Sequence, residues 1–364
     1  MSAKYEGPKL VHIVPALFRA DDGVIGGAER YAFELARNMA NAAPTTLITF
    51  GKKASEETCG ALKVRVLGNA HYIRGQATNP VAAPLAGVVL AADVVHCHQQ
   101  RVISSSLAAA MCRITGRRVF VSDLGGGGWD ISGYVSTDRW YHGHLHISEY
   151  SRKVSRHDGK AWAHVIYGGV DAKKFSPEKA RREKTVLFVG RLLPHKGVNY
   201  LINALPPDLH LEVIGKPYDQ GFLEELRRLA AGKRVTFRFD CGDDELVSAY
   251  RRAMCVVLPS VYRTMYGDET RVPELLGQTL LEGMACGTPV ICTDVASMPE
   301  VVKHGVTGFV VAPNDACALA EKLCWFRDRP DQVETMGDAA RLDALDRFTW
   351  PAVVQRCLDI YSQS

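Results

Sequence analysis

The sequence has no apolar stretch long enough to cross a membrane. Its longest apolar run, residues 81–92, contains Pro84 and is shorter than the roughly 18 residues that a membrane-spanning helix needs. The apolar segment 10–18 contains His12 and Pro15, and nothing after it resembles a cleavage site. We therefore expect a buried first strand near the N-terminus and no signal peptide.

Cysteine pairs with C-x-x-C spacing are absent as well, although the chain has 10 cysteines. Such pairs are typical of metal sites and redox centres. We expect free thiols and a cytoplasmic protein. Six cysteines lie within apolar strand or helix patterns, where reduced cysteine behaves as a small core residue: Cys97, Cys112, Cys255, Cys286, Cys292 and Cys357.

Internal repeats and low-complexity tracts are also lacking. Short apolar strands instead alternate with helical patterns, which is typical of parallel α/β sheets. The expected strands are 10–14, 46–50, 64–67, 93–96, 118–122, 144–147, 164–166, 185–189, 209–214, 234–237, 255–258, 289–292 and 308–311. The expected helices are 28–40, 102–114, 149–156, 198–205, 222–230, 244–252, 316–326, 332–341 and 351–361.

A chain of 364 residues is too long for one ordinary core and suits two domains of about 150–200 residues. We predict an α/β protein with two Rossmann-like, doubly wound domains, 1–172 and 185–347. A charged linker, 173–184, joins them, and a last helix, 348–364, closes the chain. Two such sheets that face each other place a cleft at the carboxyl ends of their strands, where these sheets bind ligands.

The net charge of +4 is unevenly distributed. Residues 1–175 carry 21 Lys and Arg against 14 Asp and Glu, whereas the remainder carries 23 against 26. A basic first half attracts an acidic acceptor or an anionic membrane face. Peripheral association with the inner face of a membrane therefore stays open beside an ordinary solvated surface, and we expect no nucleic-acid partner.

A turn with two cations follows the first expected strand of the second half. Residues 190–197 read G-R-L-L-P-H-K-G and open a helix. Arg191 and Lys196 can clamp a diphosphate there, the guanidinium as a fork and the ammonium as a point charge. A solvated basic turn is the alternative.

Two glutamates eight positions apart bracket a glycine turn and an apolar helix in E-L-L-G-Q-T-L-L-E, from Glu274 to Glu282. Gly277 lets the backbone approach a ligand closely. The free N–H groups of Gly277, Gln278 and Thr279 at the helix start face an anion. The second glutamate, two turns further in, can accept hydrogen bonds from a vicinal diol.

These two segments resemble the G-R-x-x-x-x-K-G and E-x7-E motifs of retaining, nucleotide-sugar glycosyltransferases of family GT4 (glycosyl transferases group 1), which have the GT-B fold. The resemblance extends in order over residues 9–362. It is carried by G-G-A-E-R at 26–30, D-V-V-H-C-H at 93–98, I-S-E-Y-S at 147–151, V-I-Y-G-G-V-D at 165–171, F-S-P at 175–177, and P-E-V-V with G-V-T-G-F between 299 and 309.

The resemblance implies the GT-B fold and a metal-independent hexosyltransferase that retains the anomeric configuration. The co-substrate is then a nucleoside diphosphate sugar, with UDP or GDP as the leaving group and no other cofactor. The acceptor is a glycan, a glycolipid or a small molecule. The lack of a D-x-D motif agrees with a donor held by Arg, Lys and a helix dipole, and the last helix crosses back to the first domain.

The same resemblance gives roles to single residues. Arg191 and Lys196 hold the donor diphosphate, Glu282 the ribose hydroxyls, and Glu274 lies beside the transferred sugar. The loop with Gly26 and Gly27 approaches the donor phosphates; a plain helix-start loop is the alternative.

The segment 122–128, S-D-L-G-G-G-G, departs from the family pattern. Many relatives place a histidine about where Leu124 stands, close to the transferred sugar. That contact is then missing, or Asp123 or His98 supplies it. The first-domain loops 99–106 and 125–134, where acceptors bind in the family, carry the weakest resemblance, so the acceptor stays open.

Three alternating histidines, His142, His144 and His146, could share one face of a strand and bind a metal. No cysteine or carboxylate nearby completes such a site, and we interpret the strand as structural.

Other functions are open alternatives: a GT-B nucleotide-sugar epimerase or phosphorylase-like enzyme, a Rossmann-type oxidoreductase, or a non-catalytic two-lobed sugar-nucleotide-binding protein. No lysine stands out as a pyridoxal phosphate ligand, and no G-x-G-x-x-G follows the first strand. A non-catalytic protein would not need the Arg–Lys clamp together with Glu274.

Overall fold

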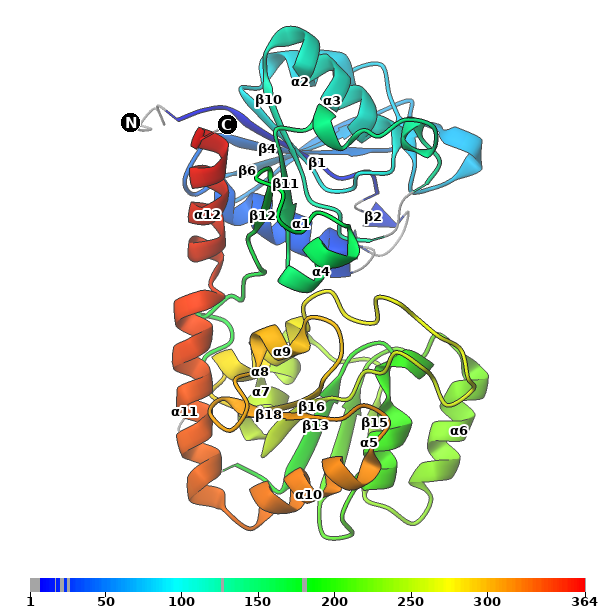
Figure 1. Ribbon diagram of the computed structural model, residues 1–364, viewed down its shortest axis with the longest axis vertical. Helices are drawn as coiled ribbons and strands as arrows, with labels where there is room; N and C mark the ends of the chain where they lie inside the picture. Colours follow the sequence, from blue (N-terminus) through cyan, green and yellow to red (C-terminus); the bar gives the residue numbers. More distant parts are fainter. Residues whose placement is uncertain are drawn as a thin grey trace. The chain divides into compact units, whose positions relative to one another are not determined.

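The computed structural model describes residues 7–16, 18–19, 23–24, 27–125, 128–178 and 182–363. The chain forms two compact units. Unit 1 comprises Met1–Tyr167 and Trp350–Ser364, and unit 2 comprises Gly168–Thr349. Unit 1 therefore takes its last helix from the far end of the chain (Figure 1).

Unit 1 is built on an eight-stranded sheet with the order β12-β11-β10-β9-β1-β4-β6-β5. Neighbouring strands pair in parallel, except that edge strand β5 pairs antiparallel with β6. The strands are β1 (Leu10–Ile13), β4 (Thr45–Phe50), β5 (Ser55–Cys59), β6 (Leu62–Leu67), β9 (Val94–Cys97), β10 (Arg118–Val121), β11 (Gly143–His146) and β12 (Ala163–Val165).

Helices cover both faces of this sheet, as the fully buried strands β1 and β9 require. Alternate strand residues point to opposite faces, so Val11, Ile13 and Val95 join the apolar core with α2 and α3. The opposite face packs against α1 and α12 (Figure 1). The helices are α1 (Gly27–Met39), α2 (Leu85–Ala91), α3 (Ile103–Thr115), α4 (Glu149–Val154) and α12 (Trp350–Gln363); two short hairpins, β2–β3 (Phe18–Arg19, Gly23–Val24) and β7–β8 (His71–Tyr72, Pro80–Val81), complete the unit.

Unit 2 contains a six-stranded, fully parallel sheet with the order β15-β14-β13-β16-β17-β18. Its strands are β13 (Thr185–Val189), β14 (His210–Ile214), β15 (Val235–Arg238), β16 (Cys255–Leu258), β17 (Val290–Thr293) and β18 (Gly308–Val311). Its helices are α5 (Val198–Ala204), α6 (Gln220–Ala230), α7 (Asp243–Arg252), α8 (Gln278–Ala285), α9 (Met298–Val301), α10 (Ala316–Arg327) and α11 (Pro330–Arg347). The predicted class, α/β with two doubly wound Rossmann-like domains, is confirmed.

The strand order reverses beside the first strand of each sheet. In unit 1, β1 lies between β4 and β9, and in unit 2, β13 lies between β14 and β16. Open parallel sheets bind ligands outside the carboxyl ends of their strands at such a switch point. The segments that follow β1 and β9, and those that follow β13 and β16, are therefore the places where a site is expected.

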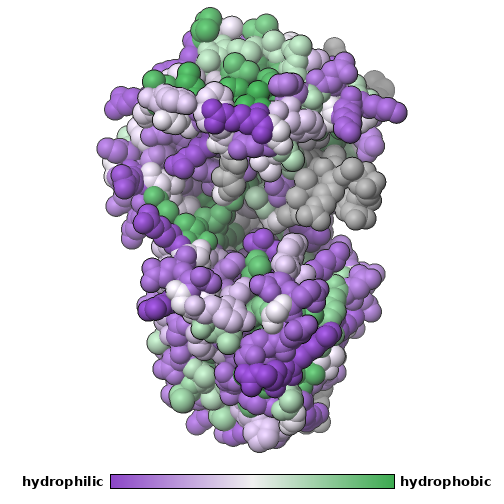
Figure 2. Space-filling model, turned by 90° about the vertical axis from the view of Figure 1, so that its right-hand side faces the viewer, coloured by the Kyte–Doolittle hydropathy of each residue, from purple (hydrophilic) through white to green (hydrophobic). Residues whose placement is uncertain are grey.

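No helix in the described part of the chain is long and apolar enough to span a membrane. Hydrophilic residues predominate on the side shown in Figure 2, and apolar residues form separate patches among them. Single exposed apolar side chains such as Ile114 and Leu342 are usual on a protein surface.

Candidate functional site

The turn after β13 packs closely against the loop that follows β16. β13 ends at Val189, and the chain continues through a short 3-10 helix, Pro194–Lys196, into α5. Gly197 has a φ of 70°, and a Cβ built there would lie 1.9 Å from the carbonyl oxygen of Pro259. Glycine at this position therefore allows the two switch-point segments to touch.

Replacing Gly197 with alanine tests this close approach. Gly232 is the matched control, because it also has a positive φ of 76° but has no atom within 4 Å of a built Cβ. Gly232→Ala should cost about 1–2 kcal/mol of unfolding free energy for its left-handed backbone. Gly197→Ala should cost about 1–3 kcal/mol more because of the clash. Urea unfolding measures both, and equal losses would show that the contact with Pro259 is unimportant.

Lys196 and Glu274 form a buried ion pair at this junction. The Lys196 ammonium contacts the Glu274 carboxylate, and the two side chains are only 11% and 12% exposed. Ser260 Oγ donates a hydrogen bond of 3.2 Å to the same carboxylate. The Lys196 ammonium also lies 3.4 Å from the carbonyl oxygen of Pro273. The residue predicted to hold the diphosphate and the residue predicted to lie beside the sugar are thus brought into direct contact.

Arg191 is exposed on the same turn. Its guanidinium carbon lies 5.9 Å from the ring centroid of Tyr218, a distance at which a cation and an aromatic face still attract weakly. Burial, with a smaller effect of the neighbouring Lys196, lowers the pKa of His195 to about 4. His195 is therefore neutral at pH 7, and the positive charge of the turn belongs to the arginine and the lysine.

The start of α8 follows the β16 loop. Gly277 precedes the helix with a left-handed φ of 82°, and among the described residues no side chain caps the first turn. The Gln278 amide group donates instead to the carbonyl oxygen of Gly169 at 3.1 Å, and Thr279 is half-buried. An uncapped helix start presents amide N–H groups and a partial positive charge to an anion.

Glu282 lies further along α8 and is oriented by Tyr250 of α7. The Tyr250 hydroxyl donates a hydrogen bond of 2.7 Å to Glu282 Oε2. Burial, followed by the nearby carboxylate, raises the pKa of Tyr250 well above its usual value, so this hydroxyl stays a donor at neutral pH. Tyr250 could not be predicted from the sequence, because it belongs to a different helix and to no motif.

Two of the predicted residues of unit 1, His98 and Asp123, follow the neighbouring strands β9 and β10. His98 directly follows β9, and its Nε2 lies 2.8 Å from Nδ1 of His12 on β1. The His98 ring stacks on His96 with centroids 4.4 Å apart. Burial, and then the neighbouring histidines, lower the pKa of His98 well below its usual value. His98 Nδ1 is buried and has no hydrogen-bond partner among the described residues.

Asp123 follows β10 and is partly buried. Burial raises its pKa, while the amide of Gly125 opposes that shift. Gly27 is the first residue of α1 and is exposed, whereas Gly26 lies outside the described residues.

The predicted site residues of unit 2 lie on two adjoining segments: Arg191, Lys196, Gly277, Gln278, Thr279, Glu274 and Glu282. In unit 1, His98 and Asp123 follow neighbouring strands.

His142, His144 and His146 do not share one strand face. His142 precedes β11, and its Nδ1 accepts a hydrogen bond of 3.0 Å from the amide of Val119. His157 takes its place beside the other two. Burial lowers the pKa of His144 to about 4 and that of His146 to about 3, so both rings are neutral at pH 7.

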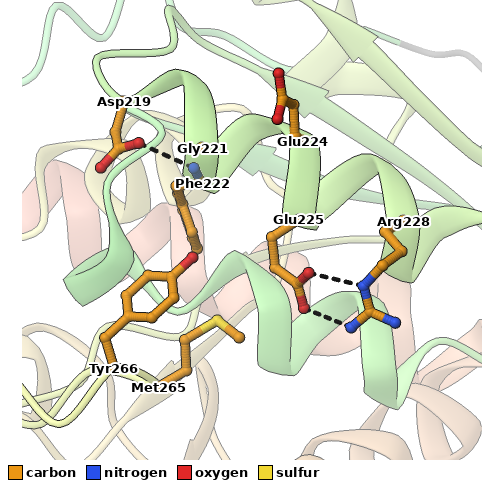
Figure 3. A pocket seen from close by; sticks show the side chains of 8 residues that line it. All are labelled: Asp219, Gly221, Phe222, Glu224, Glu225, Arg228, Met265 and Tyr266. Carbon is orange, nitrogen blue, oxygen red and sulfur yellow. Dashed lines mark hydrogen bonds and ion pairs between the residues drawn. The ribbon is translucent and has the colours of Figure 1, made fainter.

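A cavity of about 700 Å³ lies beside α6 (Figure 3). Three of its charged side chains already have partners: Arg228 pairs with Glu225, and Asp219 accepts from the amide of Phe222. None of the residues that line it is a predicted site residue. We therefore assign the ligand site to the switch point and not to this cavity.

Residues 169–343 match the family model described as "Glycosyl transferases group 1". Unit 2 is a glycosyl transferases group 1 domain. The match contains the Arg191–Lys196 turn and the whole Glu274–Glu282 segment, and it confirms the family resemblance predicted from these motifs. The contacts between the Arg191–Lys196 turn and the Glu274–Glu282 segment are thus those of a group 1 domain.

Curated relatives align with the group 1 domain and its surroundings. An uncharacterized glycosyltransferase of Methanocaldococcus jannaschii is 32% identical over 221 residues, which cover 54% of this chain and 53% of that protein. Glycogen synthase of Mycobacterium tuberculosis is 31% identical over 214 residues, which cover 56% and 49%. The chain spans about half the length of the curated relatives it matches.

The structure as a whole is similar to solved glycosyltransferase structures. Anabaena HepE in complex with UDP and glucose superposes with a TM-score of 0.74 at 20% identity, covering 98% of this chain and 100% of that chain. At this identity the likeness concerns the fold. It identifies the two Rossmann-like units, of which the group 1 domain is the second, as the GT-B fold.

Proposed function

We propose that this chain is a retaining glycosyltransferase that moves a hexose from a nucleoside diphosphate sugar to a hydroxyl group. The observation that carries the proposal is that the β13 turn, with Arg191 and Lys196, adjoins the segment that leads to the uncapped start of α8, where Lys196 contacts Glu274. That arrangement provides two cations and a helix dipole for one diphosphate. The similarity to glycogen synthase and the UDP bound to HepE support the same donor class.

The donor diphosphate is held without a metal ion in this proposal. The planar guanidinium of Arg191 binds the diphosphate through two N–H groups, and the Lys196 ammonium binds it as a compact positive charge. The Lys196 ammonium has three N–H donors and can keep Glu274 while it binds a phosphate oxygen. Fixed positive groups around a leaving diphosphate stabilise the charge that develops on it, which is usually the largest catalytic contribution. Glu282, held by Tyr250, accepts from the ribose hydroxyls.

The acceptor is a hydroxyl of a glycan, a glycolipid or a small molecule. Its proton passes to the departing phosphate oxygen, so the reaction requires no separate base. His98 and Asp123 of unit 1 are the candidates for contacts with the transferred sugar. We place the reaction in the cytoplasm, in keeping with ten free cysteines. If the acceptor is a glycolipid, we expect the protein to associate peripherally with the membrane.

The configuration of the product tests the proposal. The chain is incubated with α-linked UDP- and GDP-hexoses and a panel of glycan acceptors, and proton NMR follows the anomeric signals. We expect a new α-linked signal that depends on both donor and acceptor. Arg191→Ala should abolish it, whereas Arg228→Ala, which removes an exposed arginine of α6, should not. A β-linked product contradicts retention, and conversion of the sugar nucleotide without acceptor favours an epimerase.

A further inference from the structure

Three histidines of unit 1 form a buried cluster that the proposed reaction does not use. His144 and His146 lie two residues apart on β11, and His157 comes from the turn after α4. They are 2%, 4% and 6% exposed, and one nitrogen of each ring lies within 4.8 Å of the others. Burying three polar rings together is costly unless their nitrogens have partners.

The spacing of the rings suits a small metal ion. His146 Nε2 and His157 Nδ1 lie 3.1 Å apart and share a hydrogen bond. A tetrahedral zinc ion with Zn–N bonds of about 2.0–2.1 Å separates its ligand nitrogens by about 3.3 Å and their ring centroids by about 5 Å. The three centroid separations are 4.6, 5.2 and 6.3 Å. Small ring movements therefore exchange the shared hydrogen bond for a metal ion.

Asp138 positions two of the three rings from outside. Its backbone carbonyl oxygen lies 3.0 Å from Nε2 of His144, and its carboxylate Oδ2 lies 3.7 Å from Nε2 of His157. Gln100 donates a hydrogen bond of 2.6 Å to the other carboxylate oxygen and holds the group in place. A carbonyl or carboxylate behind the imidazole is the usual companion of a metal-binding histidine, because it fixes the tautomer that turns a lone pair to the metal.

An ion has a route to this cluster. His157 and Asp138 line a cavity of about 640 Å³ in unit 1, together with two further acidic residues, Asp123 and Asp130, and one cation, Arg101. Negative charge along an entry path raises the local concentration of cations.

We propose that His144, His146 and His157 form a three-histidine site for a divalent transition-metal ion, with zinc as the ion to which we commit. Neutral imidazole nitrogens suit zinc and not magnesium or calcium. The ion links β11 to the turn after α4, both oriented by the segment that carries Asp138, and so stabilises unit 1. This proposal is independent of the glycosyltransferase proposal, whose cationic clamp lies in unit 2.

Zinc binding to the full-length chain tests the site. The protein is freed of metal with a chelator, dialysed and titrated with Zn²⁺ in a calorimeter, and retained metal is measured after desalting. We expect one zinc ion per chain that survives desalting, a rise in the melting temperature, and no binding of Mg²⁺. Co²⁺ in place of zinc should give the visible absorption of a tetrahedral centre.

Variants distinguish zinc bound at this site from zinc bound by the other nine histidines. His157→Ala should lose the retained ion, and His157→Gln, which keeps the side chain's bulk, serves if the alanine variant does not fold. Asp138→Asn should weaken binding about 10- to 100-fold. His71→Ala removes an exposed histidine of β7 and should bind like wild type. The proposal fails if wild type retains no zinc, or if a folded His157 variant retains as much as wild type.

Discussion

Lys196→Ala is expected to lower the rate of hexose transfer about 100- to 1,000-fold, the loss typical for removing one fixed group that stabilises developing charge. The Lys196 ammonium is held against Glu274 at the β13/β16 switch point. Most of the effect should fall on kcat, because the charge on the leaving group grows in the transition state. Steady-state kinetics with saturating donor measures it.

The same substitution should also destabilise unit 2 by about 3 kcal/mol, because it leaves the Glu274 carboxylate buried without its cation. Kinetics must therefore be measured well below the melting temperature. Lys174→Ala is the matched control: that lysine pairs with Asp243 at 2.6 Å, but the two side chains are 35% and 66% exposed. It should cost less than about 1 kcal/mol and leave kcat unchanged. A folded Lys196→Ala protein with normal kcat would show that Lys196 takes no part in the reaction.

Tyr361→Ala is expected to lower the unfolding free energy of unit 1 by about 3–5 kcal/mol, as for other fully buried aromatic side chains. Tyr361 of α12 is 3% exposed. Its ring packs against Phe120 with centroids 4.7 Å apart, and its hydroxyl lies 2.7 Å from Nδ1 of His96. Arg118 donates to its backbone carbonyl oxygen at 2.5 Å. The last helix of the chain thus completes the core of the first unit.

Two further variants separate the contribution of the Tyr361 hydroxyl from that of its ring and provide a control at an exposed position. Tyr361→Phe keeps the ring and removes the hydroxyl, so it should cost only about 1–2 kcal/mol for the buried nitrogen of His96 that loses a partner. Ile114→Ala, at a position 85% exposed, should stay within about 0.5 kcal/mol of wild type. Calorimetric unfolding that resolves the two units measures all three. If Tyr361→Ala costs no more than Ile114→Ala, α12 does not stabilise unit 1.

The sequence predicted the fold wherever a segment has one clear hydrophobic period. β13 and β16 have the bounds expected from their apolar runs, because central strands of a parallel sheet are buried on both faces. β5 was missed because all five of its residues are exposed and show no apolar alternation. α2 was missed because its contiguous apolar residues do not distinguish a buried helix from a buried strand.

The candidate site could be predicted only as far as its motifs are local. Two short segments indicated Arg191, Lys196, Glu274 and Glu282, each beside a glycine turn or helix start. The ion pair between Lys196 and Glu274 joins positions 78 residues apart, and it depends on β13 and β16 being neighbours, which no local pattern reveals. Strand pairing and turn geometry likewise decide that His157, and not His142, joins the histidine cluster.

The central claim is that the β13/β16 switch point binds a nucleoside diphosphate. Thermal unfolding of the chain with UDP, GDP, ADP and NAD, repeated on Arg191→Ala and Glu282→Ala, tests it most directly. A ligand at 100 times its dissociation constant should add about 2.7 kcal/mol of stability. The account predicts that one nucleoside diphosphate stabilises wild type and that both variants lose the effect. Stabilisation by NAD alone, by none of the four, or equally in both variants would contradict it.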